Sequence, residues 1–208
     1  MDTQQRHNHW QTVFSTKGER DVSWFQERPD VSLDMIAAAG VGRDSSIVDI
    51  GGGASRLVDA LLAQGFERVT VLDVSEAALA AARARLGVRA SEAQWIAMDV
   101  TRWQPARSYD LWHDRAAFHF LTAAEERAAY VERVRQAVRP GGHVIIATFA
   151  LDGPERCSGL PVMRHDAASI DTALGPRFTL IDNRRHDHRT PGGAIQRFQF
   201  SRFQRAAT

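Results

Sequence analysis

Short apolar runs alternate with helical patterns along most of this chain of 208 residues. The runs that have the character of buried strands lie at residues 46–50, 68–75, 93–100, 108–114 and 143–150. Segments with apolar residues at helical spacing follow three of them, at residues 55–65, 76–87 and 122–138. Strands that alternate with helices in this way predict a doubly wound α/β fold, with a parallel sheet covered by helices on both faces.

Local signals indicate where several of these helices begin and end. Ser75 is a candidate cap for the helix at residues 76–87, and Gly65 is a candidate stop for the preceding helix. Thr122 is followed by Glu125 at the spacing of a capping box, so we expect it to cap the third helix. We expect the sequence RPGG to break that helix before the fifth strand begins.

The two ends of the chain depart from this alternation. Residues 177–190 and 194–205 have the character of two strands joined by a Pro-Gly-Gly turn, which predicts an antiparallel hairpin added to the parallel sheet. An aromatic-rich segment comes before a helix expected at about residues 31–39. The length fits a single domain, which we place at residues 29–208, preceded by an N-terminal cap segment at residues 1–28.

The composition of the chain argues against several classes of function. The chain has 26 Lys and Arg against 25 Asp and Glu, so its overall charge gives no support for a nucleic-acid partner. The polar start lacks the apolar region of a signal peptide, and no apolar run approaches the ~20 residues of a membrane span. Cys157 is the only cysteine, and it does not stand at the spacing of a metal site. We expect a soluble cytoplasmic protein with no bound metal and no membrane attachment.

A glycine loop directly follows the first strand. In the sequence IVDIGGGAS, Gly51, Gly52 and Gly53 stand between a strand and a helix, where glycine permits a tight turn and the close approach of a ligand. A purely structural turn would have the same sequence. Asp73 and Asp99 end the next two strands, where one carboxylate can accept both hydroxyls of a ribose and the other can reach an adenine amino group. Together these features favour a nucleotide-like ligand.

Asp49, within the first strand, helps to decide between two kinds of cofactor. A dinucleotide site offers helix amides to a pyrophosphate, and an added carboxylate beneath the loop is unfavourable there. That carboxylate instead suits a ligand with a sulfonium and an ammonium group. The third glycine of the Gly-x-Gly-x-x-Gly fingerprint is also missing. An NAD-dependent oxidoreductase is therefore the less favoured alternative.

An ordered set of motifs spans about residues 22–203: IVDIGGGAS, VLDVS, AMDV, YDLWHDR and RPGGHVIIATF, followed by the terminal hairpin. The set resembles the class I S-adenosylmethionine-dependent methyltransferases. This resemblance implies a seven-stranded, Rossmann-like sheet with the seventh strand antiparallel, S-adenosylmethionine as cofactor and S-adenosylhomocysteine as product. The segment HDRAAF resembles the one after strand four in thiopurine and tellurite-type methyltransferases and in some protein-lysine methyltransferases, except that Ala116 replaces the commoner glycine.

The resemblance also assigns cofactor contacts by position. Gly51 and Gly53 would flank the methionine part, and Asp73 would hold the ribose. Asp99 with Val100 would contact adenine, and Ser55 is a candidate donor to the methionine carboxylate. The complete set that we assign to the cofactor is Asp49, Gly51, Gly52, Gly53, Ser55, Asp73, Val74, Asp99, Val100 and His113.

Candidates for catalysis end or follow the fourth strand, where the resemblance places the meeting point of cofactor and acceptor. Asp114 is expected to stay ionised beside Arg115, which could steer an anionic acceptor or pair with that carboxylate. His119 lies one helical turn beyond Arg115 and could take a proton near neutral pH. A packing role in the core is the competing interpretation of each. Methyl transfer needs mainly alignment and desolvation, so a base is required only for a protonated acceptor.

Several aromatic residues are candidates for the acceptor pocket: Trp24, Phe25 and Phe118. The compact length favours a small-molecule acceptor, such as a thiol or another soft nucleophile. A protein side chain, such as lysine, is the leading alternative acceptor. A cofactor-binding module without catalysis is the alternative from another class. The sequence does not predict the oligomeric state.

Overall fold

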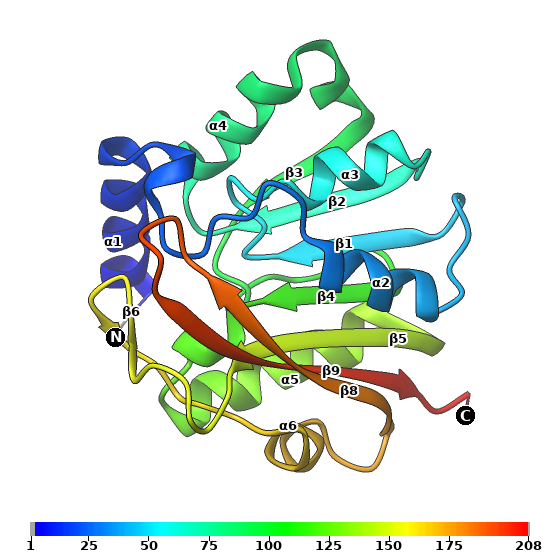
Figure 1. Ribbon diagram of the computed structural model, residues 1–208. Coiled ribbons are helices and arrows are strands. Elements are labelled where there is room, and N and C mark those ends of the chain that lie inside the picture. Colours follow the sequence, from blue (N-terminus) through cyan, green and yellow to red (C-terminus); the bar gives the residue numbers. More distant parts are fainter. Residues whose placement is uncertain (1–2, 208) are drawn as a thin grey trace.

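The structure, a computed structural model, describes residues 3–207. Its main sheet has seven strands in the order β3-β2-β1-β4-β5-β9-β8 (Figure 1). These strands are β1 (Ser46–Ile50), β2 (Arg68–Asp73), β3 (Ala93–Ala97), β4 (Tyr109–Arg115), β5 (Val138–Phe149), β8 (Phe178–Arg189) and β9 (Ile195–Arg205). A short antiparallel pair lies apart from them, formed by β6 (Arg156–Cys157) and β7 (Leu160–Pro161).

The strand directions confirm the expected mostly parallel sheet with a C-terminal antiparallel hairpin. β1 pairs in parallel with β2 and β4, β3 pairs in parallel with β2, and β5 pairs in parallel with β4. β9 runs antiparallel to both β5 and β8. The last strand in the sequence therefore lies between two earlier ones in the sheet.

Helices cover both faces of this sheet. The α-helices are α1 (Thr3–Thr16), α2 (Asp30–Ala38), α3 (Leu57–Ala63), α4 (Glu76–Leu86), α5 (Ala124–Ala137) and α6 (Ala167–Leu174), and the short 3-10 helices are η1 (Glu19–Asp21), η2 (Gly87–Glu92) and η3 (Phe118–Phe120). Buried side chains of α2, α3 and α4 form an apolar core with one face, and those of α5 and α6 form a second core with the other. In β1, Ile47 joins the first core whereas Val48 and Ile50 join the second, because successive strand residues point to opposite faces.

Two predicted boundaries around α5 are wrong. Ala123, not Thr122, occupies the N-cap position of this helix, and its backbone N–H donates to the Glu126 carboxylate (3.5 Å). The reciprocal glutamate is therefore Glu126 rather than Glu125, because it must stand three residues after the actual cap. The sequence RPGG also does not separate helix from strand, since residues 139–142 already belong to β5.

The N-terminal segment, which the sequence suggested as an aromatic-rich cap, contains the helix α1. This helix lies beside α4, near the carboxyl ends of the central strands (Figure 1). The Gln11 side chain accepts hydrogen bonds from the Ser75 hydroxyl and the Ala77 backbone N–H, both at 3.2 Å. His7 Nδ1 lies 2.9 Å from the carbonyl oxygen of Val74. These contacts hold helix α1 against the turn after β2. The division of the chain into cap and domain stays a prediction.

Tyr130 on α5 joins two buried polar groups of β4. Its hydroxyl donates to Asp114 Oδ2 (2.6 Å) and accepts from Trp112 Nε1 (2.8 Å), and all three side chains are fully buried. We expect Tyr130→Phe to lower the free energy of unfolding by about 1–3 kcal/mol, because a carboxylate and an indole N–H would each lose a partner inside the core. Urea denaturation followed by circular dichroism measures this loss.

Tyr109→Phe is the matched control for that substitution. The Tyr109 side chain is also buried, but within residues 3–207 its hydroxyl has no hydrogen-bond partner. We expect a change of at most about 0.5 kcal/mol. Equal losses in the two variants would contradict the importance of the Asp114–Tyr130–Trp112 contacts.

Candidate functional site

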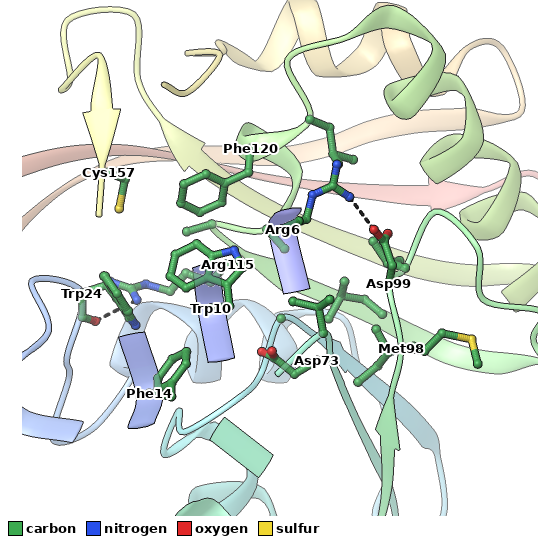
Figure 2. A pocket seen from close by; sticks show the side chains of 18 of the residues that line it. Arg6, Trp10, Phe14, Trp24, Asp73, Met98, Asp99, Arg115, Phe120 and Cys157 are labelled. Atoms are coloured by element: carbon green, nitrogen blue, oxygen red, sulfur yellow. Dashed lines mark hydrogen bonds and ion pairs between the residues drawn. The ribbon is translucent and has the colours of Figure 1, made fainter. Parts of the chain in front are cut away.

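Two adjoining cavities lie at the carboxyl ends of β1, β2 and β4, where ligands bind in parallel α/β sheets. The larger has a volume of about 820 Å³, its open mouth included, and is lined by residues of α1 as well as of the sheet (Figure 2). The smaller lies between the glycine loop and α2. Phe14, Trp24, Gly51 and Arg115 line both, so the two cavities share a wall.

The glycine loop brings the ends of β1 and β2 together. Gly51 and Gly53 have φ angles of 64° and 40°, in the left-handed region that favours glycine. A Cβ atom at Gly51 would lie 2.8 Å from that of Ala117, and one at Gly53 would lie 2.7 Å from Asp73 Oδ2. The Gly51 backbone N–H also donates to the carbonyl oxygen of Leu72 (2.8 Å). The loop thus packs tightly against the residue assigned to the ribose.

A buried row of hydrogen-bonded polar side chains lies beneath the glycine loop. His113 Nδ1 lies 2.7 Å from Asp49 Oδ1, and its Nε2 lies 2.9 Å from Ser32 Oγ on α2. A carboxylate oxygen only accepts, so Nδ1 is the donor in the first contact. Asp49 and His113 are register partners on β1 and β4, and both line the smaller cavity. Sequence reasoning missed Ser32, because no local signal indicates which helix packs at this point.

Asp73, at the end of β2, is buried and lines the larger cavity. Its Oδ1 accepts a hydrogen bond from the Ser75 backbone N–H (2.8 Å). Burial raises the pKa of Asp73 to about 7, the negative charge of Asp49 adds to the rise, and hydrogen bonds from backbone amides oppose it. A carboxylate in this position suits the paired hydroxyls of a ribose.

Asp99 lies two residues beyond β3 and lines the same cavity. Its Oδ1 accepts from the backbone N–H (2.9 Å) and the hydroxyl (2.7 Å) of Thr101, and its Oδ2 accepts from Arg6 Nη1 (2.7 Å). Arg6 reaches it from α1 (Figure 2). Arg6 also pairs with Glu126 on α5. The sequence did not indicate this cation, because Arg6 stands 93 residues from its partner.

The residues around these carboxylates fit S-adenosylmethionine. The larger cavity combines acidic groups for hydroxyls and an amino group with apolar walls suited to a flat base: Ile50, Leu72, Val74, Met98 and Val100. Of the residues assigned to the cofactor, those that line this cavity are Gly51, Asp73, Val74, Asp99 and Val100, and those that line the smaller one are Asp49, Gly51, Gly52, Ser55 and His113. Gly53 lines neither, but it packs against Asp73. Individual contacts with the cofactor stay predictions.

Asp114 does not line either cavity. Its Oδ1 accepts from the Ala117 backbone N–H (2.8 Å), its Oδ2 accepts from Tyr130, and burial raises its pKa to about 6. These bonds hold the turn after β4, in which Ala116 has a φ of 74°, a conformation that costs a non-glycine residue about 1–2 kcal/mol. Pairing with Arg115, one of the two roles considered for that residue, does not form, because neighbours on a strand point to opposite faces.

His119 also lies in the core. Its Nδ1 accepts from the Phe149 backbone N–H (3.3 Å), and its ring packs against those of Phe120 and Phe149. Burial lowers its pKa to about 3, so the ring is uncharged near neutral pH and takes up a proton poorly. Catalytic roles for Asp114 and His119 stay predictions, and neither environment favours them.

Aromatic side chains from several elements meet in the wall of the larger cavity. The Trp10 ring on α1 meets those of Trp24 and Phe120 edge to face, with centroids 5.6 and 5.0 Å apart (Figure 2). The aromatic residues that line the cavity are Trp10, Phe14, Trp24, Phe120, Phe149 and Phe198. Of the residues assigned to the acceptor pocket, only Trp24 is among them.

The other two assigned aromatic residues lie elsewhere. Phe25 stacks against the guanidinium groups of Arg20 and Arg56, both 5.4 Å from its centroid. Phe118 is buried against Tyr130, with centroids 4.8 Å apart. The sequence placed these rings near the site but did not give their direction.

Among residues 3–207, no group of three or more His, Cys, Asp or Glu side chains is placed to hold a metal ion. Over the same range, no helix is long and apolar enough to cross a membrane. The only cysteine, Cys157, lines the larger cavity, and His188 Nε2 lies 2.9 Å from the carbonyl oxygen of Ser23.

Residues 47–142 match a family model described as a methyltransferase domain. The matched segment runs from β1 into β5 and includes the glycine loop, Asp73, Asp99 and Arg115. A comparison with curated proteins finds no significant match. The finer resemblance of HDRAAF to the thiopurine and tellurite-type enzymes stays a prediction.

Solved structures share the fold. NodS, an N-methyltransferase from Bradyrhizobium japonicum WM9 in complex with S-adenosylhomocysteine, matches with a TM-score of 0.73 and 18% identity over 96% of this chain and 98% of its own. The 1,6-didemethyltoxoflavin-N1-methyltransferase of Burkholderia thailandensis matches with a TM-score of 0.69 and 20% identity over 97% and 84%. A SAM-dependent methyltransferase from Anabaena variabilis ATCC 29413 matches with a TM-score of 0.76 and 14% identity over 98% and 94%. At these identities, the likeness shows the fold.

Proposed function

We propose that this chain, which carries a class I methyltransferase domain that uses S-adenosylmethionine as methyl donor, methylates a small molecule with an aromatic or other planar ring. The aromatic lining of the larger cavity carries this proposal. Rings from α1, η3, β5 and β9 and from the segment before α2 meet around one space. Flat apolar walls of this kind suit a flat ligand, because aromatic pairs gain from stacked or edge-to-face contacts.

The size and cover of the cavity support a small acceptor. The cavity, about 820 Å³ with its open mouth included, must receive the adenosine of the cofactor as well as the acceptor, so the space left suits a small molecule. Helix α1 contributes Arg6, Trp10 and Phe14 to the lining. A small molecule can be enclosed beneath this helix, whereas the side chain of a folded protein would have to reach past it.

Different residues of the site would bind different parts of the cofactor. Asp73 and Asp99 would hold the ribose and adenine, while the glycine loop with Asp49 and His113 would hold the amino-acid end. When bound, S-adenosylmethionine supplies a methyl group that is attached to a positively charged sulfur. A lone pair of the acceptor can bond to the methyl carbon as the bond from carbon to sulfur breaks. The aromatic walls would align the acceptor and exclude water, which is the main requirement of this reaction.

The titratable groups of the larger cavity favour an acceptor that is already nucleophilic. They are Arg6, Asp73, Asp99, Arg115 and Cys157. Both carboxylates are assigned to the cofactor, and burial raises the pKa of Cys157 to about 12, so this thiol stays protonated. A thiolate, an ionised hydroxyl or a ring nitrogen therefore suits the site better than a group from which a base must remove a proton.

The test separates small acceptors from proteins. The purified chain is incubated with S-adenosylmethionine and either the low-mass or the protein fraction of a cell extract, and formation of S-adenosylhomocysteine is measured. We expect turnover with the low-mass fraction, and a lower kcat/KM for Trp10→Ala. Turnover with the protein fraction alone would contradict a small acceptor. Tight cofactor binding without turnover in either fraction would favour a non-catalytic module.

A further inference from the structure

Arg115, at the end of β4, presents an incompletely bonded guanidinium group to both cavities. Its Nη1 donates to the carbonyl oxygen of Trp24 (3.0 Å), and its Cζ lies 4.8 Å from the ring centroid of Phe198 (Figure 2). Its Nε and Nη2 are shielded from solvent and have no hydrogen-bond partner within residues 3–207. Two N–H donors of a cation are therefore left without an acceptor inside the site.

No carboxylate of the described chain neutralises this cation. The titratable groups that raise its pKa are Cys157 and, more weakly, Asp49, whereas burial lowers the pKa of Arg115 to about 10, which leaves it fully charged at neutral pH. The Cys157 thiol is protonated, and the Asp49 carboxylate is bonded to His113. A buried cation without a paired anion is strongly unfavourable, and a planar guanidinium with two open donors matches a carboxylate or another small anion.

Two ligands could bring such an anion: the carboxylate of the cofactor and an acidic group of the acceptor. The contacts of Arg115 favour the acceptor. Trp24 holds Nη1, Phe198 stacks beneath the group, and Cys157 lies close to it, and all three belong to the wall of the larger cavity. S-adenosylmethionine also adds a positive charge on its sulfur, which increases the need for an anion beside it.

We infer that the acceptor is an aromatic or heteroaromatic anion whose negatively charged group is bound by Arg115. The inference rests on the proposed function, because it places the acceptor in the larger cavity. It goes further in naming the charge of the substrate and the residue that selects it. The aromatic walls would hold the ring, and the Nε and Nη2 donors would fix its orientation.

Pairs of probes that differ only in charge test the inference. Benzoate with benzamide, and nicotinate with nicotinamide, are titrated into the cofactor-free protein and into its S-adenosylhomocysteine complex, with tryptophan fluorescence as readout. We expect at least one carboxylate to bind about tenfold or more tightly than its amide. Arg115→Met should abolish this preference, and Arg115→Lys should keep part of it. Arg107→Met is the matched control, because its guanidinium also stacks on a ring, that of Tyr109, but lines neither cavity.

Cofactor titrations distinguish the source of the anion. We expect Arg115→Met to change the affinities for S-adenosylhomocysteine and for 5′-methylthioadenosine, which lacks the amino-acid end, by no more than about threefold. A large loss of S-adenosylhomocysteine binding with unchanged 5′-methylthioadenosine binding would overturn the inference, because Arg115 would then hold the cofactor carboxylate. Equal binding of carboxylates and amides by the wild-type protein would also overturn it. Failure of the wild-type chain to bind S-adenosylhomocysteine would instead overturn the proposed function.

Discussion

The affinity of the protein for S-adenosylhomocysteine is expected to fall about tenfold for each pH unit below about pH 7, and to be nearly constant above about pH 8. The group responsible is Asp73, whose pKa burial raises to about 7. Ribose hydroxyls donate hydrogen bonds to an ionised carboxylate, so the ionised form of Asp73 is the one that binds. Below its pKa, the proton must leave before the ligand can be held. Calorimetric titrations between about pH 5.5 and about pH 8.5 measure this dependence.

Asp73→Asn is the control for that prediction. The amide has nearly the same shape but does not titrate, so we expect weaker binding at high pH and little change with pH. In the wild-type protein, titrations near pH 6.5 in buffers of different ionisation enthalpy should show release of a proton on binding. A wild-type affinity that does not vary with pH would contradict the assignment of Asp73 to the ribose.

The raised pKa values of Asp73 and Asp114 also make the stability of the fold depend on pH, so unfolding is measured at each pH beside binding. The pKa values of Asp73 and Asp114 are raised in the folded chain, from 3.8 to about 7 and to about 6. The folded state therefore holds protons that the unfolded state releases between about pH 4 and pH 7. For these two groups, the contribution to stability is most favourable below about pH 4 and is lost as the pH rises through 6 and 7. The raised pKa values of these two carboxyl groups thus act on binding and on stability in opposite directions. The lowered pKa values of the buried His119 and His165 act against them, because their contribution to stability is lost as the pH falls below about 6.5.

Gly52→Ala is expected to weaken binding of S-adenosylhomocysteine about a hundredfold or more and to cost about 1–3 kcal/mol of stability. A Cβ atom at Gly52 would lie 2.5 Å from Asp49 Oδ2 and 2.7 Å from Val71 Cγ1. Asp49 cannot swing aside freely, because its other oxygen is bonded to His113, which in turn contacts Ser32. The added methyl group must therefore displace the loop that lines the smaller cavity.

Gly192→Ala provides the matched comparison. It adds the same methyl group in the turn between β8 and β9, where the nearest atom, Thr190 Oγ1, is 3.9 Å away. We expect unchanged affinity and at most about 0.5 kcal/mol of destabilisation. Calorimetry gives the affinities and thermal unfolding gives the stabilities. If both variants bound the ligand like the wild type, the close packing of the loop on Asp49 would not be needed for cofactor binding.

The fold was predictable because its signals are local. The central strands are rich in apolar residues, as expected for a parallel sheet that is covered on both faces. Asp73 and the glycine loop were found for the same reason, since adjacent parallel strands end at the same edge of a sheet. The residues of one loop and of two neighbouring strand ends are enough to predict most of the lining assigned to the cofactor.

The acceptor side was less predictable because it depends on contacts distant in sequence. Phe149 and Phe198 become neighbours only through the pairing of β5 with β9. Trp10 and Phe14 enter the cavity from the aromatic-rich segment that was expected to form a cap, but no local signal indicated that Arg6 would enter it with them. The end of β4 illustrates the same limit. The sequence placed Asp114 and Arg115 together but could not show that their side chains point to opposite faces of the sheet.

The position of β9 between β5 and β8 has a consequence for how the chain is made. During synthesis, β1, β2 and β3, which carry or precede Asp49, Asp73 and Asp99, emerge early, and they can pair with one another before the C-terminal hairpin exists. Until residues 195–205 have left the ribosome, β5 is an edge strand with unpaired backbone groups, and β8 has no neighbour that joins it to the sheet. Phe198, which lines the larger cavity and stacks against Arg115, is then still missing. A nascent chain can thus build the cofactor side of the site before it builds the acceptor side.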